Sequence, residues 1–115
     1  MTSAIKINVI IKEPGKKARK TSISNSLENL QKWVGGYIET YTRGVWVDGE
    51  LVPIVVICNE EGRLKNLEPN CVFMGNAFVG TIILCGQDEY GELAEFPLPY
   101  QKAKEFWPFL WEEEK

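Results

Sequence analysis

Residues 4–12 alternate between hydrophobic and polar positions in a way that predicts a half-buried strand. Ile7 and Val9 stand two positions apart there, and a period of two places such side chains on one face of a sheet. A Glu-Pro-Gly turn at residues 13–15 follows, because Pro fixes one φ and Gly permits a positive φ. A second strand over residues 18–23 would complete a hairpin.

The spacing then changes to that of a short helix of about nine residues. Asn25 is expected to cap its first turn, and Glu28 three residues later completes a capping-box pattern. Gly35-Gly36 ends the helix, since glycine readily takes the left-handed conformation after a helix. A helix this short must pack on a sheet to be stable. Its apolar face is expected to contain Leu27, Leu30 and Val34.

After the helix, residues 37–41, 45–47 and 51–58 are predicted to be strands. Asp48-Gly49 between the second and third is a strong two-residue hairpin turn. Pro53 indicates an edge or irregular start to the third strand. Residues 54–57 are apolar at every position, which predicts burial on both faces.

The remaining chain predicts a polar turn at residues 59–62, an irregular connection over 64–70 and one long strand over 77–84. Gly80 within that strand indicates a bulge or a close backbone approach. Residues 92–96 are expected to pair back, and a C-terminal helix over 99–111 is kinked or ended by Pro108. The fold class predicted is α+β: one domain over residues 1–115, with a small, mostly antiparallel sheet, one short central helix and a C-terminal helix.

Composition excludes several function classes. The 115 residues include 13 Lys plus Arg, 16 Asp plus Glu and no His, a net charge of −3. His-based triads, general bases and metal sites are therefore impossible, and a general nucleic-acid binder is not expected. No apolar run is long enough for a membrane span, and no signal-peptide pattern begins the chain.

Charge is unevenly distributed along the chain. Residues 1–23 carry six basic side chains against one acidic, and residues 86–115 carry eight acidic side chains against three lysines. These ends can pair within one molecule or between subunits, or form two solvated faces.

The three cysteines, Cys58, Cys71 and Cys85, predict a reducing compartment, the bacterial cytoplasm. No two are spaced as a redox or zinc pair, and Cys58 and Cys85 each end an apolar run. We interpret both as small core residues, and we expect no metal site and no cofactor.

Several blocks in a fixed order carry a resemblance to a known family. They are Glu13-Pro14-Gly15, residues 25–31, 34–39 and 57–64, Pro69-Asn70 and Val79-Gly80-Thr81. Over residues 5–92 the chain resembles a small bacterial and phage domain family catalogued as a domain of unknown function. The resemblance implies a setting in phages, plasmids and other mobile elements, and it implies no catalytic residue or substrate. The segment 42–52 is a longer hairpin than usual, and the aromatic C-terminal segment lies outside the shared pattern.

The densest group of polar residues is the turn at 59–63. Asn59 and Glu60 at a strand end offer hydrogen-bonding groups, and Arg63 offers a guanidinium for an anionic ligand. The alternative is a purely structural turn in which Asn59 bonds its own backbone. Tyr37 and Trp46 are candidates for stacking on a ligand ring, alongside Tyr41, and core packing is the alternative for all three.

The C-terminal segment predicts an interface. Four large aromatic side chains around Pro108 exceed what one small core can bury, and exposed aromatic patches mark contacts between subunits. We therefore expect a homo-oligomer. The interface residues predicted are Phe106, Trp107, Phe109 and Trp111.

Three function classes follow from these residues. The first is a non-enzymatic oligomeric binding protein of a phage or mobile element, which sequesters a nucleotide-derived immune signal with positive charge from Arg63 and residues 16–20. The second is an interaction module that docks onto a host factor through its acidic, aromatic C-terminal segment. The third and least favoured is a carboxylate-only metal or glycan hydrolase using Glu60, Glu61 or Asp88, for which no clustered acidic motif is present.

Overall fold

The computed structural model describes residues 5–112, which form eight strands, two α-helices and one 3₁₀-helix. The strands are β1 (Lys6–Lys12), β2 (Arg19–Ser24), β3 (Ile38–Val47), β4 (Glu50–Asn59), β5 (Pro69–Phe73), β6 (Asn76–Val79), β7 (Ile82–Gln87) and β8 (Leu93–Ala94). The helices are α1 (Leu27–Val34), α2 (Tyr100–Phe106) and the 3₁₀-helix η1 (Pro108–Trp111).

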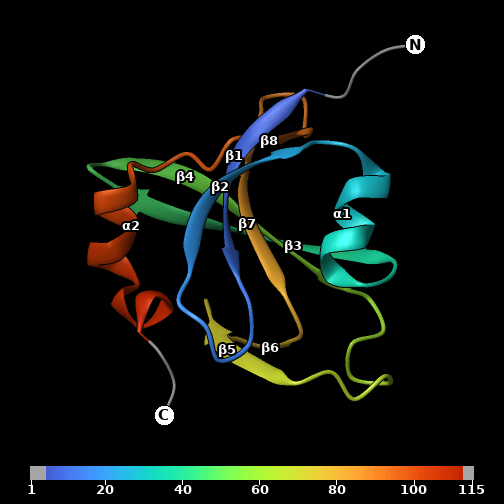
Figure 1. The fold of residues 1–115 in the computed structure, drawn as a ribbon. Helices are drawn as coiled ribbons and strands as arrows, with labels where there is room; N and C mark the ends of the chain where they lie inside the picture. The colour runs from blue at the N-terminus through green and yellow to red at the C-terminus, as the bar shows by residue number, and fades with distance from the viewer. Residues whose placement is uncertain (1–4, 113–115) are drawn as a thin grey trace.

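An antiparallel sheet in the order β2-β1-β7-β4-β3 forms the centre of the molecule (Figure 1). The short β8 pairs with the end of β7, and β5 and β6 form a separate two-stranded sheet. All strand pairs are antiparallel. The α+β prediction of a mostly antiparallel sheet with two helices is therefore confirmed.

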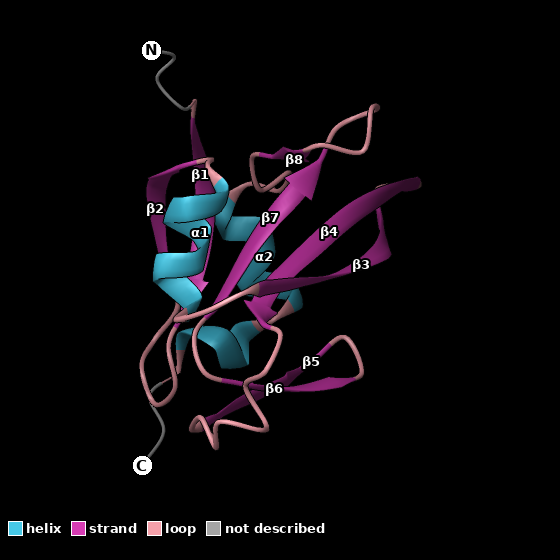
Figure 2. Cartoon of the chain, turned by 90° about the vertical axis from the view of Figure 1, so that its right-hand side faces the viewer, coloured by secondary structure: helices cyan, strands magenta, loops and turns pink. Residues whose placement is uncertain are grey.

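The sheet is covered on both faces (Figures 1 and 2). Leu30 and Val34 of α1 pack on one face, and Ala103 of α2, Leu110 of η1 and Phe73 of β5 pack on the other. Successive residues of the 54–57 run alternate between the two core clusters, and all are buried. The prediction that this run is buried on both faces is confirmed.

The start of α1 corrects the predicted cap. Ser26, not Asn25, is the N-cap, and its hydroxyl oxygen accepts a hydrogen bond from Asn29 N at 3.2 Å. Asn25 instead donates from Nδ2 to Leu93 O, which links the helix entry to β8. Leu27, the first residue of the helix, is exposed, so the buried side of α1 contains Leu30 and Val34 without it. Gly35 ends the helix with φ 79°, as predicted.

The predicted single strand over residues 77–84 is wrong. Gly80 has φ +72°, and the chain there leaves β6 in the small hairpin and enters β7 in the main sheet. A Cβ at this position would lie 2.8 Å from Leu67 Cδ1, so the expected close approach is present. The hairpin of β5 and β6 turns at Met74-Gly75. It is missing from the sequence prediction, which has an irregular connection over residues 64–70 and a strand only from residue 77.

Strands predicted separately over 37–41 and 45–47 are one ten-residue strand, β3. It pairs with β4 along its whole length around Asp48-Gly49, and both turn residues have positive φ, as the predicted hairpin requires. Pro53 lies in the part of β4 that precedes the pairing with β7, which begins at Val55.

The C-terminal segment crosses back over the sheet. Phe96 N donates to Asn8 O at 2.8 Å, so this segment takes the place of β7 beside the start of β1. Gly86 faces the crossing, and a Cβ there would overlap the carbonyl oxygen of Glu95. The helix that follows ends at Phe106, and Pro108 begins η1, which confirms that Pro108 ends the helix.

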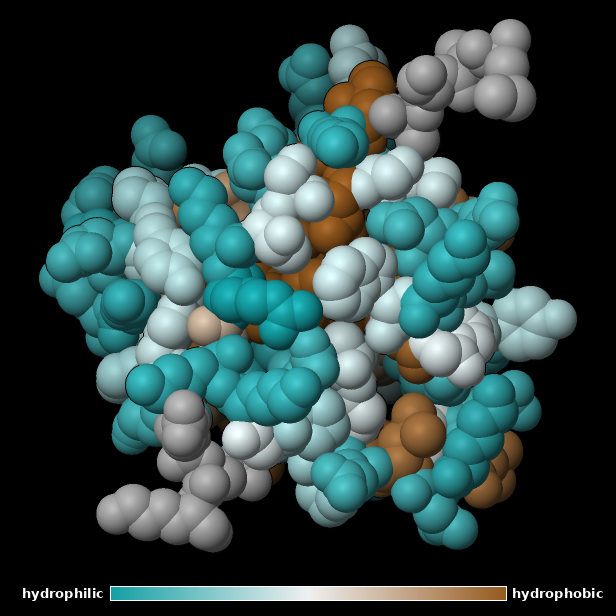
Figure 3. Space-filling view, in the orientation of Figure 1, coloured by the Kyte–Doolittle hydropathy of each residue, from teal (hydrophilic) through white to brown (hydrophobic). Residues whose placement is uncertain are grey.

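In the β1–β2 hairpin, the carboxylate of Glu13 pairs with two basic side chains at the turn. Glu13 pairs with Arg19 at 2.8 Å and with Lys16 at 3.4 Å. Hydrophilic side chains cover much of the face that carries this hairpin, and apolar surface there is confined to separate patches (Figure 3). Part of the basic excess is therefore neutralised within the hairpin itself.

This ion pair predicts a small dependence of stability on pH. The hydrogen bond from Arg19 and the nearby positive charges hold the pKa of Glu13 below its ordinary value of 4.5. Because the pKa of Glu13 is lower in the folded than in the unfolded protein, the ionised carboxylate stabilises the fold. This stabilisation is complete above the unfolded pKa and is lost as the pH falls through the folded pKa. Glu13→Gln should lower the unfolding free energy by less than about 1 kcal/mol at pH 7. In urea titrations the difference in unfolding free energy between Glu13→Gln and wild type should vanish once the pH falls below the folded pKa of Glu13. A difference that stays constant with pH would contradict this prediction.

Candidate functional site

A cleft of about 180 Å³ lies where β3, the turn after β4 and β6 meet. It collects Asn59, Glu60 and Arg63, which were predicted as ligand-binding residues, and Tyr41, which was a candidate for stacking. The other residues that line it are Glu39, Cys58, Glu61, Gly62, Leu64, Asn76, Ala77, Phe78 and Val79. The turn predicted from its polar residues is therefore one wall of a hollow whose opposite wall comes from the β5–β6 hairpin.

Asn59 has a structural position in this wall. Its side chain is buried, its Nδ2 donates to Val34 O at 3.0 Å, and its Oδ1 accepts from Glu61 N at 2.7 Å. One amide thus joins the end of α1 to the turn after β4. The amide nitrogen and the amide oxygen of Asn59 are both hydrogen-bonded within the protein. This side chain therefore shapes the wall of the cleft.

Glu60 and Arg63 are exposed at the same turn. Arg63 Nη2 donates to Ala77 O at 2.7 Å, which fixes the side chain against β6. A guanidinium has five N–H donors, and this contact uses one. Glu60 N donates to Tyr37 O at 2.8 Å, which fixes the backbone beside the carboxylate.

Tyr41 and Glu39 form the β3 wall. Tyr41 Oη donates to Glu39 Oε1 at 3.1 Å, and the Tyr41 ring meets Phe78 edge to face at 5.5 Å between centroids. The hydrogen bond to Glu39 raises the pKa of Tyr41, because the neutral phenol is the donor. Sequence reasoning missed Glu39, although its spacing of two from Tyr41 places both side chains on one face of a strand.

Tyr37 and Trp46 do not line the cleft. Tyr37 precedes β3 and is 66% exposed, and Trp46 is 69% exposed opposite Leu51. Trp46 is five residues from Tyr41 in one strand, so their side chains are on opposite faces of the sheet. The strand period therefore separates Trp46 from Tyr41. Core packing is wrong for Tyr37 and Trp46, because both rings are exposed.

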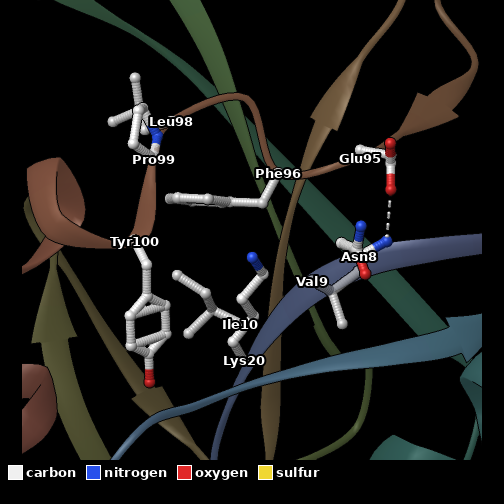
Figure 4. Close-up of a pocket in the computed structure, with 9 residues that line it drawn as sticks. All are labelled: Asn8, Val9, Ile10, Lys20, Glu95, Phe96, Leu98, Pro99 and Tyr100. Carbon is white, nitrogen blue, oxygen red and sulfur yellow. Dashed lines mark hydrogen bonds between the residues drawn. The ribbon is translucent and has the colours of Figure 1, made fainter.

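A second hollow, of about 120 Å³, lies between β1 and the crossing segment (Figure 4). Lys20 points toward the Phe96 ring, and Tyr100 extends from the start of α2 along the same space. Asn8 N donates to Glu95 Oε2 at 2.9 Å on its far side. The hollow thus combines one ammonium with two aromatic rings.

The predicted interface residues divide into two pairs. Trp107 and Trp111 pack against the core: Trp107 meets Phe73 at 5.0 Å between ring centroids, and Trp111 Nε1 donates to Tyr100 Oη at 2.8 Å. Phe106 and Phe109 are 40% and 39% exposed. The chain's own core therefore takes up more of this aromatic surface than the sequence indicates.

Two of the cysteines are buried thiols with raised pKa values. Burial, followed by the charge of Glu39, raises the pKa of Cys58 to about 11, and burial raises that of Cys85 to about 12. Both are protonated at neutral pH. In residues 5–112 no three Cys, Asp or Glu side chains are grouped so that they could hold a metal ion.

Comparison with known proteins gives one match. The family model for DUF3846, a domain of unknown function, matches residues 5–105. The chain belongs to this family. The DUF3846 match continues past residue 92, so the shared region includes most of α2, whereas Phe106 and Trp107 lie beyond it. No curated protein and no solved structure matches this DUF3846 chain. No helix within residues 5–112 is long and apolar enough to cross a membrane.

Proposed function

We propose that this DUF3846 protein is a non-enzymatic binding protein whose cleft takes a small zwitterionic ligand of amino-acid type. The observation that carries the proposal is the mixture of charges in one hollow, where Arg63 stands among acidic side chains. Glu60 and its neighbour Glu61 suit an ammonium group, and the further N–H donors of Arg63 suit a carboxylate.

The size of the cleft supports a small ligand. Its volume of about 180 Å³ is below the roughly 300–1,000 Å³ of sites that enclose drug-sized molecules. A free amino acid fills such a space. The acidic excess in the lining further disfavours a phosphate-rich ligand at this position.

The chemistry of the lining favours binding over catalysis. The thiol in the cleft, Cys58, is buried and held in its protonated form by its raised pKa. Tyr41 has a raised pKa and is a hydrogen-bond donor to Glu39, not a base. Neither group is an activated nucleophile.

A second candidate function is favoured by the hollow in Figure 4. An ammonium beside two aromatic rings suits an anionic ligand with a flat ring, such as a nucleotide. We propose that this second hollow seats one ring of such a ligand, while the rest of the ligand lies outside the space of about 120 Å³. Its function would then be to sequester a nucleotide-derived immune signal for a mobile element in the bacterial cytoplasm. Docking of a host factor by the C-terminal segment has less support, because Trp107 and Trp111 pack on the chain's own core.

Titration calorimetry with the free amino acids tests the cleft. We expect saturable heat with at least one amino acid, and Glu60→Gln and Arg63→Ala should each weaken binding about tenfold or more. Each removes one charge-assisted contact, which contributes about 1.5–3 kcal/mol.

Lys20→Ala is the matched control, because Lys20 lines the other hollow. It should leave amino-acid binding unchanged. Cyclic dinucleotides and ADP-ribose, titrated in parallel, test the second hollow, where Lys20→Ala should abolish their binding. No heat with any amino acid would refute the cleft proposal, and no heat with any nucleotide would refute the second.

A further inference from the structure

The outer edge of β3 is the longest free strand edge that residues 5–112 present. The sheet ends at β3, which pairs only with β4 (Figure 2). Thr40, Thr42, Gly44 and Trp46 are exposed along it. A long unpaired edge is a template for another strand, and natural proteins protect or use such edges.

The hairpin fixes which backbone groups point outward. In a two-residue hairpin of this type, Val47 and Glu50 beside the turn form a hydrogen-bonded pair, and such pairs then alternate along the ladder. Odd-numbered residues of β3 therefore direct their N–H and C=O groups to β4. Two observations agree with this phase. Pro53, which has no N–H, lies opposite Gly44, and Glu60 N donates to Tyr37 O. The N–H and C=O groups of Thr40 and Thr42 consequently point away from the sheet. There Thr42 O accepts a long, exposed hydrogen bond of 3.3 Å from Arg43 Nη1, which pairing with a second strand would replace.

The sequence along this edge is self-complementary. Residues 39–43 read Glu-Thr-Tyr-Thr-Arg, with opposite charges two positions either side of Tyr41. In an antiparallel pair of identical strands with the two-fold axis at Tyr41, Glu39 lies opposite the partner's Arg43. Thr40 then lies opposite the partner's Thr42, and their outward backbone groups form hydrogen-bonded pairs. Opposite charges and Thr–Thr pairs are both favourable across strands.

Other registers lose this match. An axis at Glu39 or at Arg43 sets like charges directly against each other, and an axis at Thr42 sets Arg43 against the partner's Tyr41. The ladder phase makes the Glu39–Arg43 pair a non-hydrogen-bonded one, in which side chains approach most closely. One register therefore satisfies the backbone and the charges together.

The opposite edge of the sheet does not have these properties. The six-residue β2 carries Arg19 and Lys20 and no acidic residue, so two copies of it repel. Ala18 N, just before it, already donates to Leu110 O at 2.7 Å. Of the two edges of the main sheet, only β3 matches a second copy of itself.

We propose that two copies of this chain pair through β3, antiparallel about a two-fold axis at Tyr41, so that their sheets become one. Because Glu39 and Tyr41 line the cleft, the two clefts lie beside the axis. The partner's Arg43 then adds a guanidinium next to Glu39 in each cleft. The pairing does not depend on the cleft's ligand, and its test needs none.

Sedimentation equilibrium of the full chain measures the pairing directly. We expect a species of twice the 13.1 kDa chain mass. Glu39→Arg places two like-charge pairs across the axis, and Arg43→Glu does the same with opposite sign. Each should weaken dimerisation by about tenfold or more, which corresponds to about 1.4 kcal/mol. The double variant Glu39→Arg/Arg43→Glu restores opposite charges and should restore the dimer.

Rescue by the double variant separates the interface from folding damage, because both substitutions remain present. Glu50→Lys, at the exposed tip of the same hairpin and outside the paired residues, is the matched control and should leave the dimer intact. A monomer at 100 µM wild-type chain would overturn the proposal. So would a dimer that both single charge reversals leave unchanged, or a double variant as weakly associated as either single one.

Discussion

Leu110→Ala should lower the free energy of unfolding by about 2–5 kcal/mol, measured by urea denaturation. The Leu110 side chain is fully buried in the cluster that contains Ala18 and Ala103. Replacing it leaves a cavity between η1, α2 and the sheet, which adds to the lost transfer free energy. Because the unfolding free energies of domains are about 5–15 kcal/mol, this is a large fraction of the total.

Leu64→Ala is the matched control for that experiment. Leu64 is 82% exposed in the turn after β4, so its truncation should change the stability by less than about 0.5 kcal/mol. If Leu110→Ala behaved like Leu64→Ala, the C-terminal segment would not belong to the core. A docking role for that segment would then regain support.

Asn59→Ala should cost about 2–4 kcal/mol of stability, a large effect for one amide. The substitution leaves Val34 O without its donor and Glu61 N without its acceptor. Each buried polar group left unpaired costs about 1–3 kcal/mol. The turn that carries Glu60 and Arg63 would lose its connection to α1, so ligand binding in the cleft should weaken as well.

Glu60→Ala, one residue later, separates the structural contribution from the binding contribution. Glu60 is exposed, so its truncation should change the unfolding free energy by less than about 0.5 kcal/mol while weakening binding. Equal stability of Asn59→Ala and Glu60→Ala in urea titrations would contradict the bracing function of Asn59.

Part of the cleft follows from the sequence alone. A two-residue turn at Asp48-Gly49 sets Val47 opposite Glu50, and counting outward places Glu39 opposite Cys58. That register brings Glu39 and Tyr41 to the strand end that carries Asn59 and its turn. The position of Glu39 beside the turn could therefore be predicted from the sequence. The opposite charges two positions either side of Tyr41 are likewise visible in the sequence.

The second wall of the cleft depended on the tertiary structure. Residues 77–84 form one almost entirely apolar run, which is typical of a single buried strand. Nothing local shows that Gly80 moves the chain from one sheet to another. The break is held by long-range contacts: Leu67 packs against Gly80, and Asn70 Nδ2 donates to both Gly80 O and Lys12 O at 2.8 Å. Without that turn, Phe78 would not meet Tyr41 and Arg63 would not reach Ala77.

The sequence by itself determined the strands β1 to β4 of the main sheet, the hairpin at Asp48-Gly49, the end of α1 and the absence of histidine chemistry. These follow from side-chain period, backbone freedom at glycine and proline, and composition, which act over a few residues. The tertiary structure decided which polar groups are engaged and which aromatic side chains are covered. The Asn59 amide donates to the carbonyl oxygen of Val34, 25 residues away, and the Trp107 ring packs against Phe73 of the β5–β6 hairpin. Such pairings are set by how the layers pack, because burial requires each polar group to find a partner wherever the fold places one.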